Sequence, residues 1–260
     1  MNDESMFVTR WGQSGPKVVL VHGSAQGSKV GGAHHFTAQQ RLSERGWQLL
    51  VPDRPGHGRS PDPGRPDDAQ ADGGLVADLL GKGAHLVGHS FGACVALAAA
   101  AKRPEAVRSL TIIEPAMAAM AVNKPVVLRF VLKIVAIMLF SLSAESRLKR
   151  FVKLVNIPPE IRGGSDADEL KRMGRAIKQL KLPTKPGLLH DWDIVRRAGI
   201  PVLVVSGGWR PAFEAISDET ARVGGGRRLV IRSAHHFPQQ VSDEFNLELA
   251  KFMQESELKR

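Results

Sequence analysis

Residues 85–101 read HLVGHSFGACVALAAAA, and this stretch decides the fold. An apolar run, His85–Val87, leads into Gly88–Gly92 (GHSFG), and a helix of small residues follows. A strand that turns abruptly into a helix brings backbone segments close together, so a glycine on each side of the serine avoids a clash with a Cβ atom. The turn would project Ser90 at the helix N-terminus, where unbonded N–H groups favour negative charge. Ser90 is therefore a candidate nucleophile.

Outward from this stretch, short apolar runs alternate with helical patterns in both directions. This order predicts an α/β fold with a mostly parallel sheet covered by helices on both faces, because parallel neighbours need a crossover connection. The predicted strands are 17–21, 47–51, 85–88, 110–113, 202–205 and 229–231, with 7–15 as a short antiparallel lead-in. The predicted helices of this alternating part are 36–45, 67–80, 91–102, 211–223 and 243–256.

The segment 116–190 interrupts the alternation, because it has helical patterns and no clear strand. Its helical stretches are 126–140, 144–155 and 166–180. In open parallel sheets, ligands bind at the carboxyl ends of the strands. Since this segment leaves the sheet at the end of the 110–113 strand, we expect it to form a helical cap, or lid, over that edge. Residues 1–115 and 191–260 would then form the core.

These motifs resemble those of the α/β-hydrolase fold superfamily, in its serine hydrolase and esterase-like branch. Gly88–Gly92 resembles the nucleophile elbow G-x-S-x-G of that family, and Val18–Gly23 resembles its strand ending in His-Gly. Asp53–Ser60 resembles its loop D-x-x-G-x-G-x-S. The resemblance covers most of the chain outside the predicted cap. It implies that the backbone N–H groups of Ser24 and Phe91 form an oxyanion hole.

A serine hydroxyl needs a base to remove its proton, and the chain has nine histidines. In the family, the catalytic histidine follows the last strand and precedes the last helix. Residues 233–238 (SAHHFP) stand at that place and resemble the family's G-A-G-H-F-P. The resemblance therefore assigns the base to His236, with His235 as the alternative. Histidines 22, 57 and 89 belong to turn motifs and are expected to be structural.

The third member of such a triad is an acid that orients the imidazole and stabilises the imidazolium. Most relatives place an Asp after the strand that precedes residue 207, in the form G-x-x-D, but Gly207–Arg210 reads GGWR here. Some relatives instead carry the acid after the strand that follows the nucleophile helix. Glu114 stands at that position. Glu114 is therefore the predicted acid, and Glu214 is the alternative.

A serine nucleophile, a histidine base and two N–H donors suit acyl transfer through an acyl-enzyme. We therefore expect a carboxylesterase-like hydrolase that acts on an ester, thioester or lactone of a hydrophobic small molecule. Relatives that cleave haloalkanes or epoxides use an Asp nucleophile, and the epoxide hydrolases also use lid tyrosines, which this chain lacks. Three alternatives stay open: a carbon–carbon bond hydrolase, a hydroxynitrile-lyase-like enzyme with a lid lysine such as Lys124 or Lys133, and a non-catalytic ligand-binding member of the fold.

Charge and composition limit the partners. The formal net charge is +10, but the basic residues are spread along the chain without interleaved aromatic residues, so we expect no nucleic-acid partner. No cofactor or metal is expected, and the oligomeric state is left open.

The apolar helix at 126–140 bears on contact with membranes. It contains Arg129 and Lys133, and it is too short and too charged to span a bilayer. An apolar face packed on the core is favoured over peripheral contact with a lipid surface. Residues 1–10 lack the order of a signal peptide, and the single cysteine, Cys94, excludes an internal disulfide. These features favour a cytoplasmic location.

Overall fold

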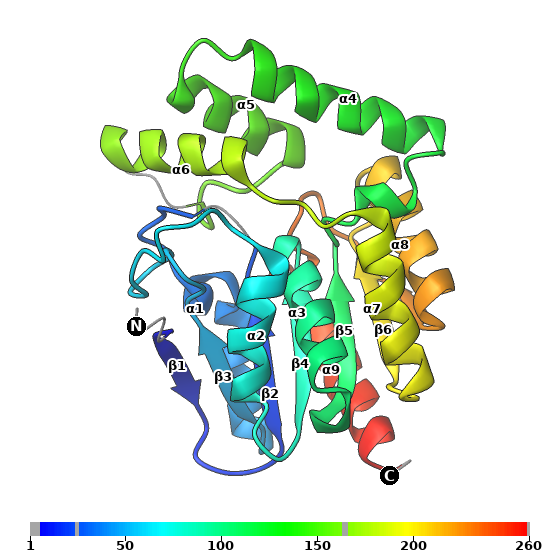
Figure 1. Cartoon of the computed structure of the whole chain (residues 1–260). Helices are drawn as coiled ribbons and strands as arrows, with labels where there is room; N and C mark the ends of the chain where they lie inside the picture. Colours follow the sequence, from blue (N-terminus) through cyan, green and yellow to red (C-terminus); the bar gives the residue numbers. More distant parts are fainter. Residues whose placement is uncertain (1–5, 24–25, 163–165, 259–260) are drawn as a thin grey trace.

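The computed structural model describes residues 6–23, 26–162 and 166–258. Within this part of the chain, seven strands form one sheet in the order β1-β3-β2-β4-β5-β6-β7 (Figure 1). Strand β1 pairs antiparallel with β3, and the other neighbours pair in parallel. The strands are β1 Val8–Trp11, β2 Lys17–Val21, β3 Gln48–Pro52, β4 Ala84–His89, β5 Val107–Ile113, β6 Val202–Ser206 and β7 Arg227–Val230. The predicted α/β architecture is confirmed.

Helices connect and cover these strands. The α-helices are α1 Gly32–His35, α2 Ala69–Leu79, α3 Phe91–Lys102, α4 Pro125–Phe140, α5 Ala144–Val155, α6 Ala167–Gln179, α7 Lys185–Arg197, α8 Pro211–Gly224 and α9 Asp243–Glu257. The 3₁₀ helices are η1 Thr37–Arg45, η2 Pro104–Ala106, η3 Ala118–Met120 and η4 Pro238–Gln240. The helix that the sequence predicts over 36–45 is a 3₁₀ helix, Thr37–Arg45.

Helix α7 was not predicted, because prolines around its start resemble a break. The structure places Pro186 in the first helical turn, where a missing N–H costs no intrahelical hydrogen bond. The Thr184 hydroxyl caps the helix by accepting a hydrogen bond from the N–H of Gly187. A proline after a capping residue thus begins this helix instead of ending one.

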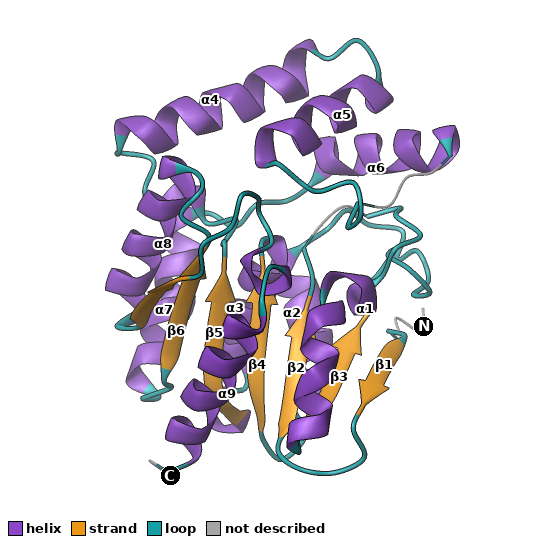
Figure 2. Ribbon diagram, turned by 180° about the vertical axis from the view of Figure 1, so that it is seen from behind, coloured by secondary structure: helices purple, strands orange, loops and turns teal. Residues whose placement is uncertain are grey.

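The sheet separates two hydrophobic cores, because successive side chains of a strand point to opposite faces. In β2, Val19 and Val21 belong to the cluster with α2, α3 and α7, whereas Val18 and Leu20 belong to the cluster with η1 and α9. Figures 1 and 2 show these two helical layers on opposite faces of the sheet. With both faces covered, ligands can approach mainly at the ends of the strands.

Helices α4, α5 and α6 lie across the carboxyl ends of the strands (Figures 1 and 2). Helices α5 and α6 pack on each other through Leu148, Val152, Met173 and Ile177. Helix α7 crosses the predicted boundary at residue 190, and its Leu188 lies in the same core cluster as α3. The division into a core of 1–115 and 191–260 and a cap of 116–190 stays a prediction. None of the described helices is long and apolar enough to cross a membrane.

Candidate active site

Ser90 stands at a sharp turn between β4 and α3. Its φ is 57°, a left-handed value that L-residues rarely adopt. A Cβ atom on Gly88 would lie 2.4 Å from the carbonyl oxygen of Gly92, and one on Gly92 would lie 2.3 Å from the carbonyl oxygen of Val21. Because these oxygens belong to the backbone, they cannot move aside. The turn therefore requires both glycines, as the sequence pattern predicts.

The structure brings Ser90, His236 and Glu114 together at the carboxyl end of the sheet. The Nε2 atom of His236 lies 2.9 Å from Ser90 Oγ, and its Nδ1 atom lies 3.0 Å from Glu114 Oε2. His236 is 3% exposed and Glu114 is 0% exposed. With the proton on Nδ1, the imidazole donates to the carboxylate and accepts from the serine hydroxyl. This arrangement suits proton removal from Ser90.

Three donors hold the buried carboxylate of Glu114. Besides His236, the N–H of Gly207 donates to Oε1 at 2.7 Å, and Trp209 Nε1 donates to Oε2 at 3.1 Å. Gly207 and Trp209 belong to the loop where most relatives carry the acid. Here that loop supplies hydrogen-bond donors to an acid on the neighbouring strand.

The alternative residues lie elsewhere. Glu214 accepts hydrogen bonds from Ser206 Oγ at 2.7 Å, from the N–H of Gly208 at 2.9 Å and from Arg228 at 2.8 Å. His235 contacts Ser233 within its own loop and is partly exposed. The geometry thus favours Glu114 and His236 over Glu214 and His235.

The end of helix α5 also contacts the loop that carries His236. Asn156, which ends α5 with φ 50°, donates from Nδ2 to the carbonyl oxygen of Ala234 at 2.6 Å. Its own carbonyl oxygen accepts from the N–H of His236 at 3.4 Å. On the other side, His89 at the end of β4 donates from Nε2 to the carbonyl oxygen of His236 at 2.7 Å. Sequence reasoning missed Asn156, Gly207 and Trp209, because no motif links these positions to the histidine.

The predicted oxyanion donors can be placed only in part. Ser24 lies outside the described residues. Phe91 is the first residue of α3, so its N–H is one of those that have no acceptor within the helix. Gly23 lies against the serine, since a Cβ atom on it would be 3.0 Å from Ser90 Cβ. The end of β2 and the start of α3 therefore border Ser90.

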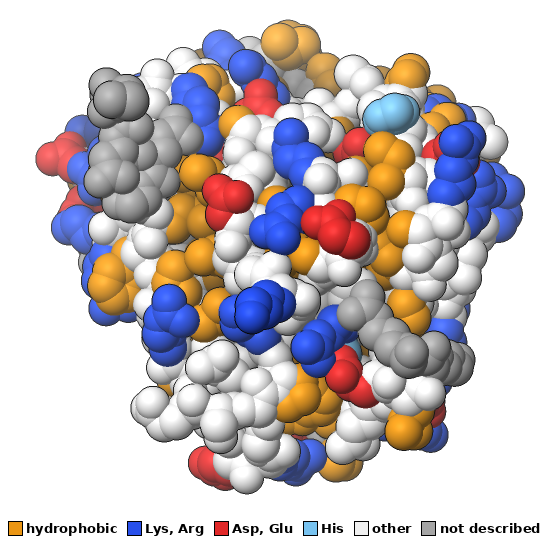
Figure 3. Space-filling view, turned by 60° about the horizontal axis from the view of Figure 1, so that its bottom comes forward, with side chains coloured by type: hydrophobic (Ala, Val, Ile, Leu, Met, Phe, Trp, Pro, Cys, Tyr) orange, Lys and Arg blue, Asp and Glu red, His pale blue; other side chains and the backbone are white. Residues whose placement is uncertain are grey.

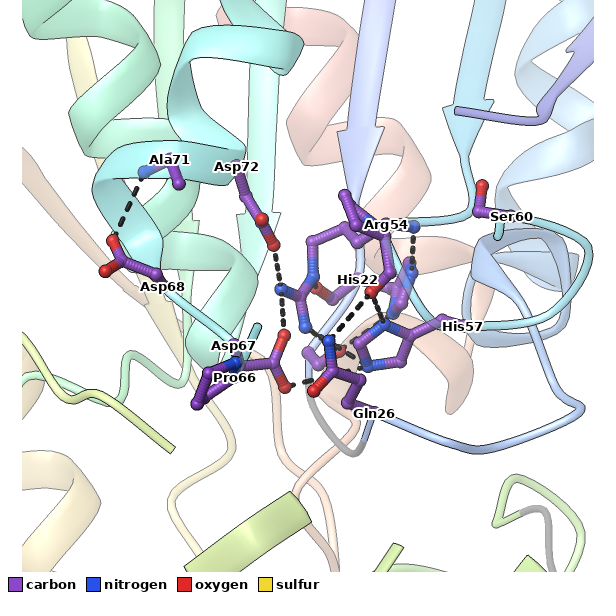
Figure 4. A network of polar contacts seen from close by, with 12 residues as sticks. His22, Gln26, Arg54, His57, Ser60, Pro66, Asp67, Asp68, Ala71 and Asp72 are labelled. Carbon is purple, nitrogen blue, oxygen red and sulfur yellow. Dashed lines mark hydrogen bonds and ion pairs between the residues drawn. The ribbon is translucent and has the colours of Figure 1, made fainter. Parts of the chain in front are cut away.

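A buried network holds the end of β2 (Figure 4). Arg54, which is 0% exposed, donates to the carbonyl oxygen of His22 at 3.0 Å and to that of Gly23 at 2.9 Å. Its Nη1 atom lies 2.7 Å from Asp67 and 2.6 Å from Asp72. The loop Asp53–Ser60, to which the sequence assigns no chemistry, thus fixes backbone next to Ser90.

Burial shifts the pKa of three histidines near the site, His22, His57 and His89, towards the neutral form. Burial, which disfavours the charged imidazolium, lowers the pKa of His57 to about 4. Burial also lowers the pKa of His22 and of His89 well below the ordinary value. This agrees with structural roles for these three residues.

A cavity of about 330 Å³ lies between Ser90 and helices α4, α5 and α6. Most of its wall is hydrophobic: Pro115, Ala116, Ala118, Phe130, Ile134, Val135, Met138, Leu139, Phe151, Val155, Ile157, Ile177, Leu180, Leu182, Phe213, Ile216 and Phe237. Gly23, Ser90, Phe91 and His236 line the cavity at the carboxyl ends of the strands, and the exposed Lys178 lines it from α6. An apolar chain attached to a group at Ser90 would fit this wall.

The model of the Alpha/beta hydrolase family matches residues 18–248. The chain belongs to this family. Lipase LipV of Mycobacterium tuberculosis is 37% identical over 120 residues, which make up 44% of this chain and 42% of that relative. The match thus spans less than half of the relative's length.

Solved structures of the alpha/beta hydrolase fold agree over nearly the whole chain. A variant of the N-acyl homoserine lactonase AidH, complexed with N-hexanoyl homoserine, has a TM-score of 0.69 at 24% identity, covering 96% of this chain and 92% of the other. The esterase EaEST of Exiguobacterium antarcticum has a TM-score of 0.70 at 19% identity, covering 96% and 95%. The predicted α/β-hydrolase fold is confirmed.

In this alpha/beta hydrolase-family chain, the geometry gives no support to the lid lysine of a hydroxynitrile-lyase-like enzyme. Lys124 Nζ lies 3.5 Å from the carbonyl oxygen of Ala215, and among the described residues neither Lys124 nor Lys133 lines the cavity. Within the described ranges, no group of three or more His, Cys, Asp or Glu side chains is placed to hold a metal ion.

Proposed function

We propose that this protein is a serine hydrolase that cleaves an ester, thioester or lactone of a hydrophobic small molecule. The observation that carries the proposal is the continuous hydrogen-bonded chain from Ser90 through His236 to Glu114 beside an apolar cavity. Relatives named as lipase, lactonase and esterase support the same substrate class.

In the acylation step, Ser90 Oγ attacks the carbonyl carbon while His236 Nε2 takes the hydroxyl proton. The carboxylate of Glu114 stabilises the imidazolium that forms. The negative charge on the carbonyl oxygen would face the N–H of Phe91 and, by the family resemblance, that of Ser24. The imidazolium then gives its proton to the leaving alcohol or thiol as the carbon–oxygen or carbon–sulfur bond breaks. The product is an acyl-Ser90.

In the deacylation step, water attacks the acyl carbon and His236 takes a proton from it. The second tetrahedral intermediate collapses, the bond to Ser90 Oγ breaks, and His236 returns the proton to the serine. A carboxylic acid leaves the cavity. With a lactone, the leaving hydroxyl remains attached to the acyl group, so one hydroxy acid is released.

The test is labelling with a fluorophosphonate together with turnover of short-chain aryl esters. Ser90→Ala should abolish labelling and lower turnover more than about a thousandfold. Ser43→Ala is the control, because Ser43 is half-buried on η1 and its hydroxyl donates to the carbonyl oxygen of Gln40 in the same segment. Folded wild-type protein that takes no label would overturn the proposal and favour a ligand-binding member of the fold. Labelling without turnover of any ester, thioester or lactone would favour a lyase or a carbon–carbon bond hydrolase.

A further inference from the structure

Helix α4 has hydrophobic side chains on two sides. Val127, Phe130 and Ile137 are buried against the rest of the protein. The outer side carries Leu128, Leu132, Val135 and Leu139, which are 44–65% exposed and follow the helical spacing of four, three and four residues. Sequence reasoning favoured one apolar face packed on the core, and the structure leaves this second face uncovered.

The exposed row continues to the end of the helix at Phe140, past it to Leu142, and into the cavity. Phe140 and Leu142, which follow Leu139, are 73% and 102% exposed. Val135 and Leu139 themselves line the cavity that borders Ser90. The row therefore connects the outer surface of α4 with the wall of the proposed substrate cavity.

The same part of the chain carries nearly all of the net charge. Residues 116–190 contain 14 lysines and arginines but only five acidic residues, so they carry +9 of the chain's +10. The rest of the chain is close to neutral, and Figure 3, in which the bottom of Figure 1 comes forward, shows acidic and basic side chains interspersed there. Arg129 and Lys133 are exposed on α4 beside the hydrophobic row.

We propose that this cap face, defined by Leu128, Leu132, Leu139, Arg129 and Lys133, docks on an anionic phospholipid surface. The leucines would enter the boundary between headgroups and acyl chains, and the two cations would meet the anionic headgroups. The cavity would then open at the lipid surface. This inference concerns binding and does not rest on the proposed catalysis.

Other partners fit these observations less well. Nucleic acid would satisfy the positive charge but offers no apolar phase for the row of leucines. A second copy of the chain would cover the leucines but would bring two segments of charge +9 against each other. An anionic bilayer complements both features at once.

The experiment measures co-sedimentation of the full chain with phosphatidylglycerol vesicles and with phosphatidylcholine vesicles. We expect binding to phosphatidylglycerol that weakens as salt is added. Leu132→Asp should weaken it about tenfold or more. The control is Leu247→Asp on α9, because Leu132 and Leu247 are 56% and 54% exposed; this change should leave binding unaltered.

A second pair of variants tests the charge. Removing both Arg129 and Lys133 by substitution with Gln should weaken binding to phosphatidylglycerol about 25-fold, at about fivefold for each cation. The matched control is Lys82→Gln with Lys102→Gln, two exposed lysines of the core.

Circular dichroism of each variant separates lost binding from lost folding. The inference is overturned if wild-type protein ignores phosphatidylglycerol vesicles, or if the core variants weaken binding as much as the cap variants do. The inference is also overturned if the wild-type protein is a dimer without lipid and Leu132→Asp makes it a monomer, because the partner of this face would then be a second copy of the chain. Ester turnover is scored separately, so failure of docking and failure of catalysis are distinguishable.

Discussion

Replacing Glu114 by Gln isolates the acid, because the two side chains have nearly the same shape. In the native structure, Oε1 accepts from the N–H of Gly207, and Oε2 accepts from Trp209 Nε1 and His236 Nδ1. An amide has only one oxygen, so it cannot accept from all three donors. One of its two ends must present an NH₂ group to a donor.

Either orientation of that amide damages the site. If the NH₂ group faces His236, the imidazole must accept at Nδ1 and carry its proton on Nε2, where it can no longer take the proton of Ser90. If the NH₂ group faces Gly207, a buried N–H loses its acceptor at a cost of about 1–3 kcal/mol, and the imidazolium loses its counter-charge. In a serine protease, the corresponding change from acid to amide lowers turnover by about 10⁴. We expect a loss of about 10³–10⁴ here, or about 4–5.5 kcal/mol of barrier.

The assay is the rate of fluorophosphonate labelling together with kcat/KM on an aryl ester, measured under conditions in which wild type and variants are all folded. Glu214→Gln is the control, because the carboxylate of Glu214 bonds to Ser206, Gly208 and Arg228 and not to His236. Its activity should stay within about threefold of wild type, although its stability can fall. A Glu114→Gln variant that keeps more than about a tenth of the activity, or a larger loss in Glu214→Gln, would refute the reasoning.

Three further predictions concern stability, each measured by urea unfolding. Gly92→Ala should prevent or severely weaken folding, because the new Cβ atom would lie 2.3 Å from a backbone oxygen. Gly74→Ala should instead stabilise α2 by up to about 1 kcal/mol, because no atom of another described segment lies within 4 Å of the new Cβ. Equal effects of the two substitutions would contradict the steric argument. His57 has its pKa lowered to about 4, so the unfolded chain binds the extra proton and stability falls as pH drops from about 6.5 towards 4. Between pH 7 and pH 5, His57 should lower the free energy of unfolding by about 2 kcal/mol, so the His57→Gln variant should lose about 2 kcal/mol less stability than wild type over this range. The same pH dependence of stability in both proteins would contradict this prediction. Arg54→Met should cost about 3–5 kcal/mol because it leaves buried aspartates without their partner, and a variant as stable as wild type would show that the network contributes little.

Much of the fold and part of the site could be predicted from sequence because the deciding forces are local. The glycines at 88 and 92 are required by the backbone of a single turn. Apolar runs of strand length that alternate with helical patterns indicate a parallel sheet covered by helices. A histidine in a short motif after the last strand could be singled out in the same way. Local rules failed at α7, because its prolines can mark either a break in the chain or the start of a helix. The packing of this helix on α3 decides for the start of a helix.

Only the tertiary structure decided which groups meet. Glu114 and His236 are 122 residues apart in the chain, and Glu114 approaches the histidine because the sheet places β5 between β4 and β6. The donors Gly207 and Trp209 and the cap residue Asn156 follow from that same packing. The sequence also showed that α4 is apolar, but it could not divide its side chains into buried and exposed ones. A sequence encodes the conformation of neighbouring residues through sterics, whereas contacts between distant segments depend on how whole elements pack, which no single motif specifies.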